Sequence, residues 1–446
     1  MLDEIFEEVQ TAMSKAIEAL QRDLAGIRTG RATITLLDGI RIEYYGQVTP
    51  LNQVATISVP EARLLMIKPW EKGVIPDIEK AIRADAALGL NPANDGTVIR
   101  LPIPELTEEQ VTELREAFDA EAKGKPGLDN FRLVKEKIQG LEEGRMLVRN
   151  HFLSLDPYMR GRMSGVRSYA KPVEVGKVMT GATVGEVIES RHPEFEKGDI
   201  VVGRGEWQEY ALLKGGECQK VDPSWPSPSL ALGVLGMPGV TAYTGMKNIG
   251  KPVTGETVVV AAASGAVGAV VGQIAKIHGA RSVGVAGSKE KCTYVREELG
   301  FDECLLHRAP DFSRNLRESC PDGIDIYFEN VGGAVFETVL PLLNDFARIP
   351  VCGLISHYND TQLPEGPNPT PKLMRDILVK RLNFRGFIVW DFAEQEEEAL
   401  KSLAGWIREG KLKYREDFVD GLDQAPEAFM GLLQGNNFGK LIVRLD

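Results

Sequence analysis

A glycine-containing turn between a strand-like and a helix-like segment is the strongest chemical signal in this sequence. Residues 258–280 read VVVAAASGAVGAVVGQIAKIHGA, with Gly265 and Gly268 flanking Ala266 and Val267. Glycine there lets a diphosphate approach the backbone closely, where unpaired N–H groups and the helix dipole favour negative charge. The pattern predicts dinucleotide binding at these four residues. The alternative is a tight strand-to-helix turn without a ligand.

The end of the next strand-like segment, VGVAGSKEK at 283–291, distinguishes two cofactors. NAD enzymes usually place an acid there to hold the ribose 2′-hydroxyl, and none stands at positions 286–288. A hydroxyl at Ser288 and an ammonium group at Lys291 could instead meet an added 2′-phosphate. We therefore predict NADP(H) rather than NAD(H), although Lys291 could also be a solvated helix lysine.

Cysteine and histidine spacing does not indicate a metal site. The five cysteines include no CxxC pair, and the five histidines lie about thirty or more residues apart, so no local HxxH or HExxH site exists. We expect no metal, reduced thiols and a cytoplasmic protein.

The segments that must position these residues alternate between strand-like and helix-like patterns from Thr254 to about residue 355, which predicts a parallel, doubly wound sheet. Residues 123–235 form a series of glycine-bounded β segments. Before them, apolar spacing predicts a helix over 3–26, β-rich segments over 33–69, a helix over 76–87, a strand over 97–104 and a helix from Thr107, with Gln110 completing a capping box.

Composition supports a multidomain globular chain. The 446 residues are 43% hydrophobic, enough for sizeable cores, and the net charge of −12 argues against bulk phosphate neutralisation. No apolar run approaches the ~18 residues of a membrane span, so we expect no membrane association.

Several blocks, in order, resemble the zinc-independent medium-chain reductases, nearest to the NADPH-dependent alkenal, curcumin and prostaglandin reductases. They are LSLDPYMRGRM (153–163), GVLGMPGVTAY (233–243), AAASGAVGAVVGQIAK (261–276), DIYFENVGG (325–333), RIPVCGLISHYN (348–359) and GNNFGKLIVRL (435–445). The resemblance covers about 123–446 and implies a GroES-like β domain flanking a Rossmann domain. The family's usual first strand is missing before Gly124 or replaced by FDAEAKGKP.

The resemblance implies reduction of the carbon–carbon double bond of an α,β-unsaturated ketone or aldehyde by NADPH. Tyr358 matches the family's tyrosine near the substrate carbonyl, where a neutral phenol would donate a hydrogen bond. A structural tyrosine on a loop is the alternative. His307 falls where many relatives carry a tyrosine, and its role stays open. The same carry-over implies cofactor contacts at Asn330, Cys352, Gly353 and Asn437, and substrate contacts at Tyr158, Met237 and Thr241.

Residues 1 to about 115 resemble ribosome recycling factor, in IRTGRA (27–32), LLDGIRIEYYG (36–46), EKAIRADAALGLNP (79–92) and RLPIPELTEEQ (100–110). That family has a three-helix bundle with an inserted β/α domain, and only the first helix, the insert and the start of the second helix are present here. Arg28 and Arg31 match its basic segment; they could contact RNA phosphates or belong to a solvated helix end.

We therefore expect an α/β chain with β-rich parts. A recycling-factor-like helix (1–30) and small β/α domain (31–106) precede a linker helix (107–122). A GroES-like domain (123–240 and 385–446) then encloses a Rossmann domain (241–384). The predicted function is NADPH-dependent enone or enal reduction, with a homodimer compatible with the family. The alternative is a ribosome-binding recycling factor with an appended reductase, for which the ribosome would be the partner.

Overall fold

The computed structural model describes residues 37, 40–44, 47–61, 64–84, 92–102, 112–118, 122–138, 140–165, 168–362 and 368–445. The chain divides into two compact units, Met1–Val111 and Thr112–Asp446. The helix expected over 3–26, and with it Arg28 and Arg31, lie outside the described residues.

The first unit is a small β/α domain, as the sequence predicted. Its antiparallel sheet has the order β3-β4-β6-β5, and β1 pairs separately with β2. Ile67 of β4 and Ile78 of α2 are fully buried in its core. The elements are β1 (Arg41–Tyr44), β2 (Gln47–Pro50), β3 (Ala55–Glu61), β4 (Leu64–Pro69), α2 (Ile75–Ala84), β5 (Ala93–Asn94) and β6 (Ile99–Pro102).

The second unit begins with a strand where we expected a linker helix. Strand β7 (Thr112–Phe118) pairs antiparallel with β8 (Phe131–Lys137), from Thr112 opposite Lys137 to Phe118 opposite Phe131. The helix prediction over 107–122 is therefore wrong at 112–118. Helical propensity contributes only tenths of a kcal/mol per residue, and pairing with β8 satisfies the backbone groups of both strands. The first strand that seemed missing before Gly124 is thus supplied by residues 112–118.

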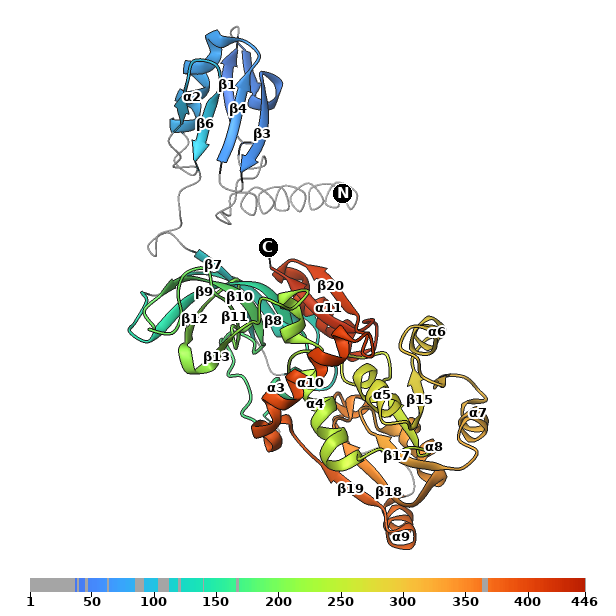
Figure 1. Cartoon of the computed structure of the whole chain (residues 1–446). Coiled ribbons are helices and arrows are strands. Elements are labelled where there is room, and N and C mark those ends of the chain that lie inside the picture. Colours follow the sequence, from blue (N-terminus) through green and yellow to red (C-terminus); the bar gives the residue numbers. More distant parts are fainter. Residues whose placement is uncertain are drawn as a thin grey trace, which may run out of the picture. The chain divides into compact units, whose positions relative to one another are not determined.

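A seven-stranded sheet forms the β-rich part and draws on both ends of the second unit (Figure 1). Its order is β13-β11-β10-β9-β21-β20, with β12 also paired to β9, so the C-terminal β21 lies beside β9. Trp207 stacks on Phe131 in its core, with ring centroids 5.5 Å apart. The strands are β9 (Arg145–Ser154), β10 (Thr183–Ser190), β11 (Ile200–Gly203), β12 (Tyr210–Lys214), β13 (Cys218–Lys220), β20 (Glu416–Asp420) and β21 (Lys440–Arg444).

A six-stranded sheet with the order β16-β15-β14-β17-β18-β19 forms the Rossmann part, and every neighbouring pair is parallel. The strand order reverses between β14 and β17, and ligands of such sheets bind at the carboxyl ends of the strands at this point. The strands are β14 (Thr257–Ala261), β15 (Arg281–Ala286), β16 (Glu303–Leu306), β17 (Ile324–Phe328), β18 (Leu343–Val351) and β19 (Asn383–Gly386).

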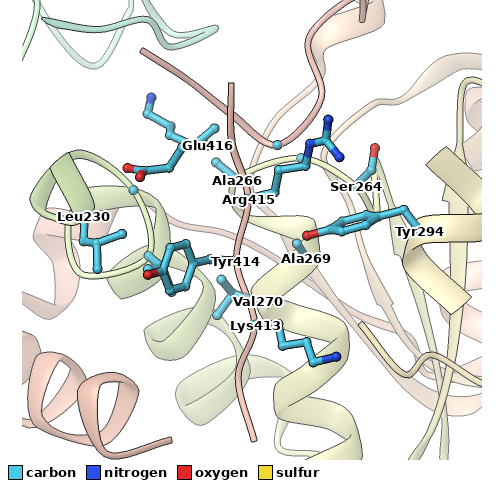
Figure 2. A pocket seen from close by; sticks show the side chains of 15 residues that line it. Leu230, Ser264, Ala266, Ala269, Val270, Tyr294, Lys413, Tyr414, Arg415 and Glu416 are labelled. Carbon is cyan, nitrogen blue, oxygen red and sulfur yellow. The ribbon is translucent and has the colours of Figure 1, made fainter. Parts of the chain in front are cut away.

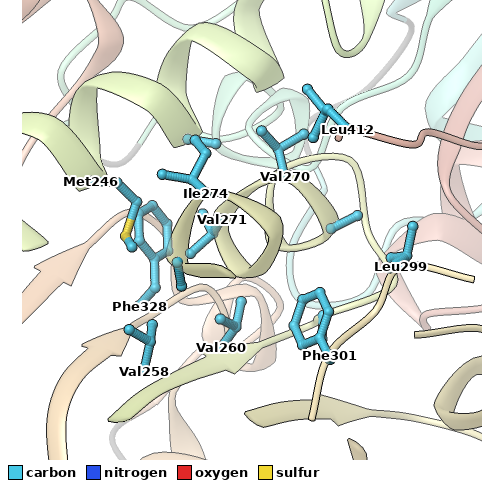
Figure 3. Packing of buried hydrophobic residues seen from close by; sticks show 14 of the residues in the cluster. Met246, Val258, Val260, Val270, Val271, Ile274, Leu299, Phe301, Phe328 and Leu412 are labelled. Carbon is cyan, nitrogen blue, oxygen red and sulfur yellow. The ribbon is translucent and has the colours of Figure 1, made fainter. Parts of the chain in front are cut away.

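Helices cover this sheet and close its core. Figure 3 shows Val270, Val271 and Ile274 of α5 packed beside Val258 and Val260 of β14. These apolar side chains recur at the three- and four-residue spacing of a buried helix face. The helices are α5 (Gly268–Ile277), α6 (Lys289–Glu297), α7 (Phe312–Ser319), α8 (Gly333–Val339) and α9 (Thr370–Lys380).

The Rossmann part extends beyond the boundary that we expected at residue 384, because that position lies within β19. Helix α10 (Glu396–Arg408) also packs against α4 (Met237–Gly245), and Tyr243 Oη donates to Glu398 Oε1 at 2.8 Å. Leu403 of α10 belongs to the same core as β14. Residues 385–408 therefore pack with the Rossmann part rather than with the β-rich part.

None of the described helices has the length and apolarity needed to cross a bilayer.

Candidate functional site

The turn after β14 has the geometry of an anion-binding corner. Gly265 N donates to Ala262 O at 2.9 Å, and α5 begins at Gly268. A Cβ on Gly268 would lie 2.3 Å from Ala262 O, so helix and strand can approach this closely only at glycine. Within the described chain, the amides of Ala266, Val267 and Gly268 have no backbone acceptor outside the helix. That these amides receive a diphosphate stays a prediction, with which their lack of a backbone acceptor is compatible.

The C-terminal segment is built against this corner. Gly265 forms a parallel bridge with Gly439. Gly439 has a φ of 92°, and a Cβ added to it would lie 2.3 Å from Arg415 O, so this position requires glycine. Gln273 of α5 fastens the crossing segment, donating to Lys413 O at 2.9 Å and accepting from Lys413 N at 2.8 Å. Asn437, predicted from the resemblance, donates to Gly439 O at 2.8 Å and so shapes the same turn.

A pocket opens beside the corner, between residues 230–234, 264–270, 413–416 and 439–440 (Figure 2). The Arg415 guanidinium lies 3.8 Å from the Phe438 ring centroid and 5.8 Å from that of Tyr294. Arg415 could not be predicted from the sequence, because the rings that it contacts, and the turn itself, lie on other segments of the chain. It adds a cation close to the turn that presents the free amides.

A polar group gathers at the carboxyl ends of β15 and β16, where the 2′-phosphate was predicted. Ser288 Oγ caps α6 by accepting from Lys291 N at 3.2 Å, which leaves its hydroxyl hydrogen for another acceptor. Lys291 Nζ donates to Gly435 O at 2.6 Å, and burial lowers the pKa of Lys291. Ser288 and Lys291 are therefore brought together as expected, but Lys291 already has one partner.

His307 and Arg308 join this group. The His307 amide donates to Ala286 O at 3.2 Å, and its Nε2 lies 3.7 Å from the position of a Cβ on Gly287. Burial, and then the charge of Arg308, lower the pKa of His307. Arg308 follows His307 at the end of β16, and its charge also contributes to the lowered pKa of Lys291. Arg308 was missed, although a basic residue directly after a parallel strand could have indicated it.

Asn330 holds the strand order reversal together. Its Nδ2 donates to Ala261 O at 2.8 Å, joining the ends of β17 and β14. The preceding Glu329, which sequence reasoning missed, accepts from Val331 N at 2.6 Å and Gly332 N at 2.8 Å. Burial raises the pKa of Glu329. A buried acid next to a predicted site residue is the signal that could have identified it.

Cys352 and Gly353 lie directly beside these residues, since both of their amides donate to Glu329 O, at 2.9 and 3.1 Å. Burial raises the pKa of the Cys352 thiol to about 12, so the thiol is neutral at pH 7. Gly353 leaves space for Tyr358, because a Cβ there would lie 3.2 Å from Tyr358 Oη and 3.3 Å from Asn330 O. The structure thus brings Asn330, Cys352, Gly353 and Tyr358 together.

Tyr358 is placed to act as a hydrogen-bond donor. Its Oη accepts from Leu354 N at 3.4 Å, and no acceptor within the described chain takes its hydroxyl hydrogen. Burial raises the pKa of Tyr358 above its ordinary value, so the phenol stays protonated at neutral pH. The group that the resemblance placed near a substrate carbonyl has a free proton to donate there.

The three residues expected at the substrate are not equally close to Tyr358. Tyr158 is two residues before Arg160, whose Nε donates to Oδ1 of Asn359, the residue after Tyr358, at 2.9 Å. Met237 opens α4, and Thr241 Oγ1 donates to its carbonyl at 2.7 Å. No hydrogen bond described in the structure joins Met237 or Thr241 to Tyr358. In the part of the chain that the structure describes, no group of three acidic, histidine or cysteine side chains is arranged for a metal.

A parallel sheet with free amides at its order reversal, completed by a β-rich part drawn from both ends of the second unit, defines a nucleotide-dependent oxidoreductase fold. Family models agree: residues 115–221 match the N-terminal domain of oxidoreductase, and residues 266–405 match zinc-binding dehydrogenase. The chain belongs to the medium-chain reductase family, as its similarity to curcumin, 2-alkenal and prostaglandin reductases shows.

Individual relatives are similar over most of their length. An NADPH-dependent curcumin reductase of Escherichia coli is 53% identical over 323 residues, which is 72% of this chain and 94% of that reductase. A 2-alkenal reductase (NADP+-dependent) of Nicotiana tabacum is 42% identical, over 68% of this chain and 87% of that enzyme. The structure of CurA in complex with NADPH from Vibrio vulnificus has a TM-score of 0.73 at 50% identity, covering 75% of this chain and 99% of that one.

The N-terminal unit has its own match. The ribosome recycling factor model matches residues 20–147, which overlaps the start of the oxidoreductase match. The family comparison therefore supports the recycling-factor-like segment that the sequence predicted.

Proposed function

We propose that the protein reduces the carbon–carbon double bond of α,β-unsaturated ketones or aldehydes with NADPH. The observation that carries this proposal is the free hydroxyl hydrogen of Tyr358, held over Gly353 and beside Asn330 at the reversal point of the sheet. The names of its relatives, an NADPH-dependent curcumin reductase and a 2-alkenal reductase, support the same reaction.

The chain's residues fit the cofactor at three places. The amides of Ala266, Val267 and Gly268 would hold the diphosphate, and the cations Lys291 and Arg308 the 2′-phosphate. Asn330, Cys352 and Gly353 would lie beside the nicotinamide. When bound, NADPH supplies the hydride for the β-carbon of the substrate.

Tyr358 stabilises the charge that the reaction creates. As electron density moves from the double bond to the carbonyl oxygen, the phenol donates a hydrogen bond to that oxygen in a half-buried environment, where such a bond is stronger than in water. Protonation of the α-carbon completes the reduction. Glu329 accepts from two amides and Asn330 Nδ2 donates to Ala261 O, whereas the hydroxyl hydrogen of Tyr358 has no acceptor within the described chain and can go to the substrate oxygen.

NADPH oxidation, followed by absorbance with curcumin or a 2-alkenal, tests this function. Tyr358→Phe should lower kcat by about tenfold to a hundredfold, because removing one oxyanion donor has effects of that order or larger. NADPH affinity should not change. A folded wild-type protein that binds NADPH but reduces neither substrate would refute the proposal.

We further propose that the protein forms a homodimer joined through β19. We also propose that it acts in the cytoplasm, where thiols stay reduced and NADPH is available. Support comes from the place of β19 as the last strand of its sheet, with a single pairing partner in β18. Gly386→Pro removes an edge N–H, because the next residue, Phe387, directs its N–H to Val351 O of β18, and it should convert the dimer to a monomer in light scattering. An unchanged mass, or a monomeric wild type, contradicts this assembly.

The proposal does not extend to ribosome recycling. That family's activity depends on a three-helix bundle, and residues 112–118, where the second helix was expected to continue, form β7 paired with β8. A bundle helix and this strand cannot occupy the same residues at once.

A further inference from the structure

The loop that carries Tyr358 is hydrogen-bonded to the turn between β17 and α8. Ser356 N donates to Val331 O at 3.0 Å, and Ser356 Oγ donates to the same carbonyl at 2.5 Å. His357 accepts at Nε2 from Gly333 N at 3.1 Å. The two residues directly before Tyr358 are therefore both fixed to this turn.

The His357 ring has a second partner on its other side. Its Nδ1 lies 2.8 Å from Asp360 Oδ2. Because the Gly333 amide is a donor, Nε2 must offer a lone pair, and because a carboxylate accepts, Nδ1 must carry the hydrogen. A neutral imidazole meets both demands in one tautomer, with Nδ1 protonated and Nε2 unprotonated. The two partners thus fix the orientation of the ring and the place of its hydrogen.

The turn is shaped to receive this ring. Gly332 and Gly333 have φ angles of 79° and 55°, in the left-handed region that favours glycine. A Cβ on Gly332 would lie 2.9 Å from His357 Cδ2, so only glycine allows the ring to lie this close. The imidazole therefore packs on the turn, although 39% of its side chain is exposed.

The phenol of Tyr358 is only weakly held by hydrogen bonds of its own. Within the described chain, its Oη forms one hydrogen bond, with Leu354 N, and the distance of 3.4 Å is long. The position of the phenol therefore depends on the backbone that leads to it. That backbone is bonded to the turn that follows Asn330, the residue that we place beside the nicotinamide. His357 thus connects the cofactor side of the site with the hydrogen-bond donor.

We propose that His357 is a positioning residue for the reaction: its imidazole, held between Asp360 and the Gly333 amide, fixes the Tyr358 hydroxyl relative to the nicotinamide. The inference rests on the proposed reductase function and adds a residue that does not touch the substrate. The bond to Gly333 is the decisive one, because it joins the loop to the turn. Asp360 belongs to the same loop as His357 and orients the ring.

Three substitutions of His357 test the proposal in NADPH oxidation with a 2-alkenal. His357→Ala removes both bonds and should lower kcat about threefold to tenfold, the size of one or two hydrogen bonds, with KM changed by less than about twofold. In His357→Gln the amide oxygen reaches the place of Nε2, so kcat should stay within about twofold of the wild type. In His357→Asn the shorter amide reaches only the place of Nδ1, so this variant should behave like His357→Ala.

A double variant and a control separate positioning from general damage. In the Tyr358→Phe background, which lacks the hydroxyl that His357 positions, His357→Ala should change kcat by less than about twofold. His192→Ala removes a histidine of the β-rich part that likewise accepts from a backbone amide, Glu194 N, at 3.2 Å, and it should leave kcat unchanged. A loss in His357→Ala that is equally large with and without the Tyr358 hydroxyl overturns the proposal. Equal kcat in the alanine and glutamine variants does so too.

The tautomer of His357 provides a readout that needs no turnover. In NADPH-loaded protein with ¹⁵N-labelled histidine, the nuclear magnetic resonance signal of His357 is assigned by its absence in His357→Gln. At about pH 7.5 it should show the Nδ1–H tautomer. The Nε2–H tautomer, or a mixture of the two, overturns the proposal whether or not an enal is reduced. If none is reduced, the proposed reductase function fails, and the spectrum still decides whether His357 is held between Asp360 and Gly333.

Discussion

Asp156 and Lys440 form a buried ion pair, with Lys440 Nζ 2.6 Å from Asp156 Oδ1 and both side chains less than a tenth exposed. Lys440 Nζ also donates to Leu155 O at 2.9 Å, and Ser154 Oγ donates to the other oxygen of Asp156. Lys440 follows Gly439, which bridges to the cofactor corner, and Asp156 precedes Tyr158 by two residues. The pair therefore connects the segment that bridges to Gly265 with the segment that carries Tyr158.

Breaking this pair should be strongly destabilising. Lys440→Met leaves the Asp156 carboxylate buried without its counterion, which we expect to cost about 3 to 5 kcal/mol of unfolding free energy. Urea denaturation measures the change. In the double variant Lys440→Met/Asp156→Leu, part of the loss should be recovered because no lone charge remains. If the double variant is less stable than Lys440→Met by the whole amount that Asp156→Leu costs in the wild type, the two residues are not coupled.

Adding one methyl group at the corner should impair the protein. Gly268→Ala places a Cβ 2.3 Å from Ala262 O, so the start of α5 must shift, and both the melting temperature and NADPH affinity should fall, affinity by more than about tenfold. The matched control is Gly405→Ala in α10, where no atom lies within 4 Å of the new Cβ. There we expect unchanged NADPH binding and stability equal to or above wild type by up to about 1 kcal/mol.

Selectivity between the two nicotinamide cofactors should depend on Lys291 and Arg308. Replacing either by a neutral residue (Lys291→Ala or Arg308→Gln) removes a cation from the predicted 2′-phosphate site, so NADPH should bind about tenfold more weakly while NADH binding stays the same. Fluorescence titration measures both affinities. Equal wild-type affinities for NADPH and NADH would contradict the assignment of this site.

The pKa of Tyr358 predicts how activity and stability respond to alkali. Burial raises this pKa above 10.0, the phenol's ordinary value, so the protonated donor persists and kcat should show no loss attributable to Tyr358 between pH 6 and pH 9. The stability contribution is complete below pH 10 and is lost as the pH rises through the folded-state pKa. Tyr358→Phe should therefore melt with less pH dependence than wild type above pH 10. A Tyr358-dependent fall in kcat near pH 8 would show that the phenol ionises much earlier.

Much of this site followed from local sequence. The corner at Gly265–Gly268 could be predicted because a buried strand, two glycines and a helix are consecutive in the chain, and backbone geometry alone requires glycine there. Ser288 could be predicted as well, since a cap acts on the residues that follow it. Arg415 was missed because its ring partners, Phe438 and Tyr294, lie on other segments, and Glu329 because its burial depends on the sheet around it. A basic residue directly after a strand could have indicated Arg308.

The sequence by itself determined the alternating β/α order, the cofactor corner and the character of Tyr358 as a neutral donor, because each depends on residues close together in the chain. Only the tertiary structure decided that residues 112–118 pair as a strand with β8 and that β19 and α10 extend the Rossmann part. Those outcomes depend on which segments become neighbours in space, where long-range pairing and burial outweigh local propensity.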